Sequence, residues 1–242
     1  MDGVLDKKYA QERLKKKYLK FRYKQRAIVS AWVIKKYLNW NNGFKLIDFG
    51  AAEGLTLAEL AGLFEGKGEF LGIEYDQSLI ESAPELPSNV KLKQGNVSHM
   101  ADISNNSVDA IIALAILEHL ENPLSVVVEA KRILKPGGIF IGTSPVPFWD
   151  KFSSKFEFGK GFGREHHLAD MNRKYFLKLA EQSGFKVERY FKFMLLPLGF
   201  SPYLGISVDP LLAWRIDNFI GKLKLFNWLF VNQCVVLKKS SL

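Results

Sequence analysis

The stretch that decides the fold class is Leu46-Ile47-Asp48-Phe49-Gly50-Ala51-Ala52-Glu53-Gly54. A short apolar run ends at Gly50, small residues follow, and Gly54 opens a helical pattern. Gly50 permits a tight turn and a close approach of a ligand to the backbone, and the start of the helix offers unpaired N–H groups. This order is typical of the nucleotide-binding corner of a doubly wound sheet. The spacing G-x-x-x-G differs from G-x-G-x-x-G, which argues against a dinucleotide, and a plain turn between strand and helix stays possible.

Apolar strands and helical stretches alternate outward from this corner, which predicts a parallel sheet covered by helices on both faces. The predicted strands are Lys45–Phe49, Glu69–Glu74, Val90–Gln94, Val108–Ala113, Ile139–Ser144 and a final pair, Phe185–Phe193 and Phe230–Lys238. The predicted helices are Leu55–Phe64, a short one from Ser78, Leu124–Leu134 and Asn172–Ser183.

The domain organisation follows from where this alternation starts and breaks. Residues 1–43 are predicted to form a basic helical extension, and 44–242 one α/β domain. Two stretches, 145–168 and 194–229, interrupt the alternation and are predicted to be insertions over the sheet edge.

Composition narrows the protein class. The 242 residues carry a net charge of +9, and residues 1–45 alone hold 13 Lys or Arg against 3 Asp or Glu, so the remainder is nearly neutral. The single cysteine excludes an internal disulfide. The sequence contains no cluster of His and Cys residues that would indicate a metal site. We find no signal peptide and no apolar run of about 18 residues, so we expect a cytoplasmic protein.

The second strand ends in Glu74-Tyr75-Asp76. Glu74 lies where a carboxylate accepts both hydroxyls of a ribose, although a solvated acid at a strand end is the alternative. Asp76 is suited to cap the next helix.

Together these motifs resemble class I S-adenosylmethionine-dependent methyltransferases, in particular the small-molecule branch that includes ubiquinone and menaquinone biosynthesis enzymes. Asp48–Gly54 resembles the family's D-x-G-x-G-x-G motif, with Ala52 in place of its middle glycine. The later matching segments are Gln94-Gly95-Asn96-Val97, Ser107–Asp109 with Ala113–His119, Arg132–Gly138, and His167 with Phe176–Phe185. The resemblance implies a Rossmann-like, mostly parallel seven-stranded sheet with an antiparallel last strand.

The resemblance also implies S-adenosylmethionine as cofactor, and it assigns roles to individual residues. Glu74 would bind the ribose, Asn96 the adenine amine, and Ala113 with Leu114 the methionine part. The full predicted cofactor set is Asp48, Gly50, Ala51, Ala52, Gly54, Glu74, Tyr75, Asn96, Val97, Ala113 and Leu114.

Two further groups are candidates. His166 and His167 follow the first insertion, where a base or an acceptor-orienting group is expected, although a structural role is the alternative. Tyr18, Arg22 and Arg26 share one helical face and are candidate lid contacts to the cofactor carboxylate, unless they form a solvated basic face.

The acceptor is predicted from the apolar stretch 193–214. This stretch is expected to line a pocket for a small or lipid-like acceptor, to contact an anionic membrane, to form a dimer interface, or to add a helix to the core. The function predicted is methyl transfer to an apolar small molecule. The alternatives are an RNA- or protein-modifying methyltransferase that uses the basic N-terminal helix, and a binding protein that keeps the fold. Nucleic acid is disfavoured because no RNA-binding module is present.

Overall fold

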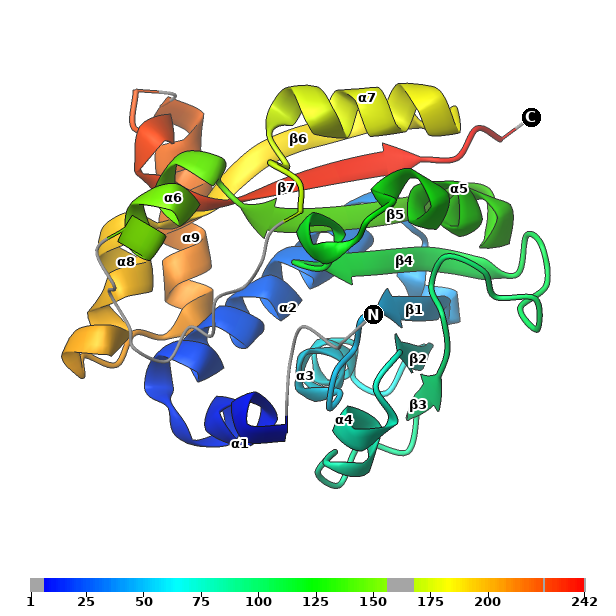
Figure 1. Cartoon of the computed structure of the whole chain (residues 1–242), viewed down its shortest axis with the longest axis horizontal. Coiled ribbons are helices and arrows are strands. Elements are labelled where there is room, and N and C mark those ends of the chain that lie inside the picture. Colours follow the sequence, from blue (N-terminus) through cyan, green and yellow to red (C-terminus); the bar gives the residue numbers. More distant parts are fainter. Residues whose placement is uncertain (1–6, 156–167, 224, 242) are drawn as a thin grey trace.

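The computed structural model describes residues 7–155, 168–223 and 225–241 (Figure 1). Its sheet has the order β3-β2-β1-β4-β5-β7-β6. The strands are β1 (Lys45–Phe49), β2 (Glu69–Glu74), β3 (Val90–Gln94), β4 (Val108–Leu114), β5 (Leu134–Pro145), β6 (Lys186–Leu195) and β7 (Phe230–Lys238). The first five strands run parallel, and β7 pairs antiparallel with both β5 and β6. The predicted Rossmann-like sheet with an antiparallel last strand is confirmed.

Helices cover both faces of the sheet, because alternate residues of the central strands point to opposite sides. Ala110 and Ile112 of β4 pack with α2 (Lys17–Tyr37) and α3 (Leu55–Gly62). Ile111 and Ala113 pack on the other side with α5 (Pro123–Ile133) and α7 (Arg173–Ser183). The sheet therefore separates two hydrophobic cores.

Side-chain caps set where several helices begin. Asp76 accepts from the Ser78 N–H at 2.8 Å and starts α4 (Gln77–Glu81), as the sequence predicted. Asn122 and Asn172 cap α5 and α7 in the same way. Such caps satisfy backbone N–H groups that have no partner within the helix.

The start of β5 was predicted wrongly. The strand begins at Leu134 and not at Ile139, because Leu134 already pairs with Val108 and the register then shifts before Ala110 pairs with Ile139. A Cβ at Gly138 would lie 2.9 Å from the carbonyl oxygen of Lys135. The Pro-Gly-Gly sequence thus forms an irregularity within the strand, and not a loop ahead of it.

The N-terminal residues form two helices, α1 (Lys7–Lys15) and α2. Eleven of the 21 residues of α2 are buried, and Val29, Val33 and Ile34 belong to the core beneath β1 and β4. This part of the N-terminal segment is thus a covering layer of the sheet.

The two predicted insertions are largely helical where the structure describes them. Residues 147–155 form α6 (Pro147–Lys155). The second contains α8 (Leu196–Phe200), α9 (Pro210–Ile220) and three single turns, η3 (Ser201–Leu204), η4 (Gly221–Leu223) and η5 (Asn227–Leu229). Two further turns, η1 (Trp40–Asn42) and η2 (Leu117–His119), complete the described elements.

Asp217 joins α9 to α2 and to the end of β6. Its carboxylate accepts from the N–H groups of Met194 at 2.7 Å and Leu195 at 2.9 Å, and from the Gln25 amide at 3.1 Å. Burial raises its pKa to about 6, although these three hydrogen bonds act in the opposite direction. One buried acid therefore holds three separate segments together.

Replacing Asp217 with Ala is expected to lower the free energy of unfolding by about 2 to 4 kcal/mol, because buried backbone N–H groups lose their acceptor. Asp209→Ala is the matched control on the same helix. Asp209 is exposed and caps α9 through the Leu212 N–H at 2.7 Å, so its loss should cost about 1 kcal/mol. Urea unfolding of both variants tests the difference, and equal losses would contradict the role given to Asp217.

Candidate active site at the carboxyl end of the sheet

The turn between β1 and α3 is fastened to the end of β2. The N–H groups of Gly50 and Ala51 both donate to the Ile73 carbonyl, at 2.9 and 3.2 Å. Gly50 has φ +74°, and a Cβ there would collide with Ile116. Only glycine fits this position without moving that side chain.

Ala52 also lies in the left-handed region, with φ +49°. It stands where the resembling family has its middle glycine, so this turn keeps the glycine-like backbone shape at a cost in strain. Its N–H donates to Glu74 Oε2 at 2.8 Å, which holds the backbone in that shape.

Glu74 accepts two further backbone hydrogen bonds through Oε1, from the N–H groups of Tyr75 at 2.7 Å and Asp76 at 3.1 Å. Because a carboxylate offers about four acceptor positions, one on Oε2 is left for a ligand hydroxyl. The side chain is only partly buried at the carboxyl end of β2. The structure thus places the predicted ribose acid directly beside the glycine turn, whereas the Tyr75 side chain is exposed.

Three carboxylates gather behind the turn. Asp48 and Glu53 are buried, and Glu74 contributes a repulsive interaction to both. Burial raises the pKa of Asp48 to about 8, against the attraction of Arg13 and Arg26. Among the described residues Asp48 Oδ1 has no hydrogen-bond partner. A positive charge placed beside Asp48 would lower this pKa again.

Arg13 of α1 closes this corner from the N-terminal side. Its guanidinium lies 3.1 Å from Glu53 Oε1 and donates to Thr56 Oγ1 at 2.8 Å. Burial raises the pKa of Glu53, and the Arg13 charge opposes that shift. No local sequence pattern predicts this contact, because the partners are 40 residues apart.

The predicted adenine contacts lie in the loop after β3. Asn96 is exposed, and its Oδ1 accepts from the Ser98 N–H at 2.9 Å, whereas Val97 is buried. A carbonyl oxygen accepts two hydrogen bonds, so this contact leaves one for a ligand amine.

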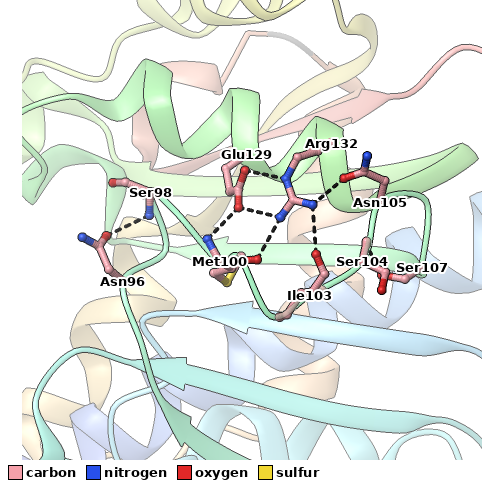
Figure 2. Close-up of polar contacts among 9 residues, drawn as sticks. All are labelled: Asn96, Ser98, Met100, Ile103, Ser104, Asn105, Ser107, Glu129 and Arg132. Atoms are coloured by element: carbon pink, nitrogen blue, oxygen red, sulfur yellow. Dashed lines mark hydrogen bonds and ion pairs between the residues drawn. The ribbon is translucent and has the colours of Figure 1, made fainter.

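A pair of charged side chains from α5 fixes that loop (Figure 2). Arg132 donates to the carbonyl oxygens of Met100 and Ile103, each at 2.9 Å, and to Glu129 at 2.7 Å. Glu129 in turn accepts from the Met100 N–H at 2.7 Å. We infer that this clamp positions Asn96, a role that the helical sequence around Arg132 did not reveal.

Gly72 was also missed. A Cβ at this position of β2 would lie 2.5 Å from the Ala51 Cβ and 2.5 Å from Leu92. Its missing side chain lets the turn lie against the strand. A small residue within an apolar strand was the only available signal.

The end of β4 forms the other wall. Ala113 is fully buried and Leu114 partly buried, and Ala115 follows with φ +57°. The Ala115 N–H donates to the Thr143 carbonyl at 2.9 Å. The backbone thus turns away from the sheet here and places Ile116 over Gly50.

The three candidate lid residues do not share one environment. Arg26 is close enough to Asp48 to lower its pKa. The Tyr18 ring instead stacks on Tyr203, with the ring centroids 4.2 Å apart. Arg22 is partly buried. Contact of these residues with a cofactor stays a prediction.

His166 and His167 lie outside the residues that the structure describes, so their catalytic role also stays a prediction. Within the described ranges, no group of three or more His, Cys, Asp or Glu is arranged to hold a metal ion.

The sequence model of the methyltransferase domain family matches residues 41–192, which include the glycine turn, Glu74 and Asn96. The chain belongs to the methyltransferase domain family. The cofactor of class I members is S-adenosylmethionine, which carries a sulfonium and an ammonium against one carboxylate.

Two curated relatives show how this methyltransferase domain is used elsewhere. A Mycolicibacterium smegmatis protein named "Probable S-adenosylmethionine-dependent methyltransferase" is 24% identical over 149 residues, which cover 60% of this chain and 53% of the relative. A ubiquinone biosynthesis O-methyltransferase of Alkalilimnicola ehrlichii is 33% identical over 100 residues, 40% of this chain and 39% of the relative. The chain thus spans about half or less of the length of these two relatives.

Solved structures agree on the fold. A crystal structure described as a sarcosine dimethylglycine methyltransferase from Galdieria sulphuraria superposes with a TM-score of 0.60. The match covers 90% of this chain and 85% of the other at 17% identity, so it supports the architecture alone.

The residues present fit S-adenosylmethionine. Glu74 Oε2 keeps an acceptor position beside the glycine turn, and Asp48 Oδ1 is a buried oxygen without a hydrogen-bond partner among the described residues, whose ionised form a cation would stabilise.

The raised pKa of Asp48 predicts the pH dependence of stability. Between pH 4 and 8 the folded chain holds a proton on Asp48 that the unfolded chain has released. The stability from this group is therefore complete below about pH 4 and is lost as the pH rises to about 8, by up to roughly 1.4 kcal/mol per pH unit.

Urea unfolding of the wild type and of Asp48→Asn over this range measures the effect. The free energy of unfolding of the wild type minus that of the variant should fall with rising pH. A constant or rising difference would contradict the placement of an uncompensated carboxyl group in this corner.

Proposed function

We propose that this chain transfers the methyl group of S-adenosylmethionine to a small, apolar acceptor. The observation that carries the proposal is the Glu74 carboxylate, which holds the glycine turn through Ala52 and keeps an acceptor position beside it. The family match and the buried acidic corner support the same cofactor.

The roles of the residues follow from their places. Glu74 would accept the ribose hydroxyls, Asn96 the adenine amine, and the backbone around Gly50 would lie along the cofactor. The ends of β1 and β4, at Asp48 and Ala113, would face its methionine part. When bound, S-adenosylmethionine supplies a methyl group on a positively charged sulfur, and a neutral thioether remains after transfer.

Alignment is the main contribution expected from these residues, because the leaving group is neutral. Buried carboxylates stabilise the positive charge before transfer, and the hydrogen bonds of Glu74 fix the ribose relative to the turn. A hydroxyl acceptor also needs a base near neutral pH, and His166 and His167 are the candidates for it.

An apolar acceptor is favoured by two observations. The relative from Alkalilimnicola ehrlichii is named an O-methyltransferase of ubiquinone biosynthesis. In this chain the second insertion is rich in apolar residues and adjoins the N-terminal helices that close the cofactor corner. A quinone-like or phenolic molecule therefore fits better than a charged one.

The RNA- or protein-modifying alternative rests on the basic N-terminal helices. Part of that charge faces inward, since Arg13 is buried against Glu53 and Arg26 acts on Asp48. The exposed lysines of α1 and α2 remain available to anionic surfaces. Less of the N-terminal positive charge is therefore exposed for binding RNA or an acidic protein than the sequence suggested.

Replacing Glu74 with Ala should weaken S-adenosylmethionine binding about tenfold to a hundredfold, because hydrogen bonds to a charged acceptor are lost. Titration calorimetry measures the change. Glu69→Ala is the matched control, since Glu69 is exposed at the opposite end of the same strand and pairs with Lys45. Thermal unfolding confirms that both variants fold. Equal affinity of wild type and Glu74→Ala would contradict the proposed ribose contact.

A methyl-transfer assay with labelled S-adenosylmethionine tests the acceptor class. Labelled product is expected with quinone-like and phenolic compounds, and the same assay offers RNA and protein extracts as alternatives. Product from RNA or protein alone would overturn the small-molecule acceptor and leave the cofactor assignment intact.

A further inference from the structure

Exposed apolar side chains are concentrated in residues 204–228. Of the 15 large hydrophobic residues that are exposed in the described part of the chain, nine lie in this short stretch. They are Leu204, Ile206, Leu211, Leu212, Phe219, Leu223, Leu225, Phe226 and Trp228. Such a concentration on a protein surface marks an interaction site.

Helix α9 carries the centre of this surface. Its buried side packs on α2 through Trp214, whose ring lies 5.3 Å from the Trp32 ring, and through Asp217. Its other side presents Leu211, Leu212 and Phe219, which are 46%, 53% and 64% exposed. The helix is therefore apolar both toward the core and toward the outside.

The exposed charges on this surface are positive except at Asp209. Between residues 204 and 228 the acidic residues are Asp209, which caps α9, and Asp217, which is buried. Arg215 and Lys222 are exposed on or beside the helix. The outer face of α9 thus combines leucine and phenylalanine with positive charge.

A groove with a volume of about 510 Å³ continues this surface onto α2. Its basic wall is formed by Lys17, Lys20 and Lys24, of which Lys24 also pairs with Glu59 at 3.5 Å. Its other wall is formed by residues of the second insertion, which include Val208, Pro210 and one acid, Asp209. In Figure 1 α9 lies beside α2 on the same flank of the molecule as α1. The groove therefore joins the basic N-terminal helices to the apolar start of α9.

We propose that this surface, formed by residues 204–223 and 225–228 together with Lys17, Lys20 and Lys24, binds the surface of an anionic phospholipid bilayer. The apolar side chains would enter the interface between headgroups and acyl chains, and the lysines with Arg215 would contact lipid phosphates. Within the described ranges no helix is long and apolar enough to cross a membrane. In this proposal α9 would lie along the bilayer surface.

The charge pattern favours a bilayer over a second copy of the chain. A symmetric dimer places the same patch against itself, which would bring these lysines and Arg215 together without exposed acids beyond Asp209 to compensate. The exposed leucines and phenylalanine of α9 favour a bilayer over nucleic acid, because binding to phosphates alone does not require apolar side chains. The proposal is independent of methyl transfer.

Flotation with vesicles of equimolar phosphatidylglycerol and phosphatidylcholine tests it, and vesicles of phosphatidylcholine alone are the comparison. We expect the full chain to float with the anionic vesicles and much less with the neutral ones. Binding should weaken as salt rises, because exposed charges are screened over about 10 Å at 0.1 M salt.

Leu212→Ser with Phe219→Ser should weaken binding about tenfold through the lost apolar insertion. Its control is Val128→Ser, an equally exposed apolar residue on α5 across the sheet. Lys17→Glu with Lys20→Glu should weaken binding at least about tenfold at low salt. Its control is Lys174→Glu with Lys178→Glu on α7, which covers the opposite face.

Thermal unfolding and S-adenosylmethionine binding of each variant show that the fold is kept. Three outcomes would overturn the proposal: no flotation with either vesicle, equal loss of binding in the control variants, or a dimer in analytical ultracentrifugation that Leu212→Ser with Phe219→Ser dissociates. Failure of vesicle binding with intact cofactor binding would leave the proposed function standing.

Discussion

The hydrogen bond from the Ala52 N–H to the Glu74 carboxylate is the interaction on which the site depends. It ties the turn after β1 to the end of β2 and keeps Ala52 in a left-handed conformation that L-residues avoid. The glycines on either side make this possible, since Gly50 leaves room for Ile116 and Gly72 for Ala51. A single acid thus shapes the turn and keeps an acceptor position, the one proposed for the ribose.

The same corner explains why the N-terminal helices are part of the domain. Buried carboxylates are costly without nearby positive charge. Arg13 pairs with Glu53, and Arg13 and Arg26 both lower the pKa of Asp48. Core packing of Val33 and Ile34 fixes α2 beneath the sheet and so places Arg26. Part of the positive charge of the N-terminal helices therefore stabilises buried acids, and the rest is exposed.

Much of this was predictable from local sequence. Strands such as Lys45–Phe49 are short apolar runs, and the glycine turn with Glu74 after the second strand has a recognisable spacing. The Arg13–Glu53 pair, the Glu129–Arg132 clamp and the need for Gly72 were not predictable, because each depends on which distant segments the fold brings together. The early start of β5 was missed because glycines usually end a regular strand, whereas here they form an irregularity inside one.

The central claim is that S-adenosylmethionine binds at the carboxyl ends of β1, β2 and β4. A crystal structure of the chain grown with S-adenosylmethionine tests it most directly. The account predicts the cofactor along the turn at Gly50, with its ribose hydroxyls on Glu74 and its adenine near Asn96. A cofactor bound elsewhere on the molecule, or a ribose without contact to Glu74, would contradict it.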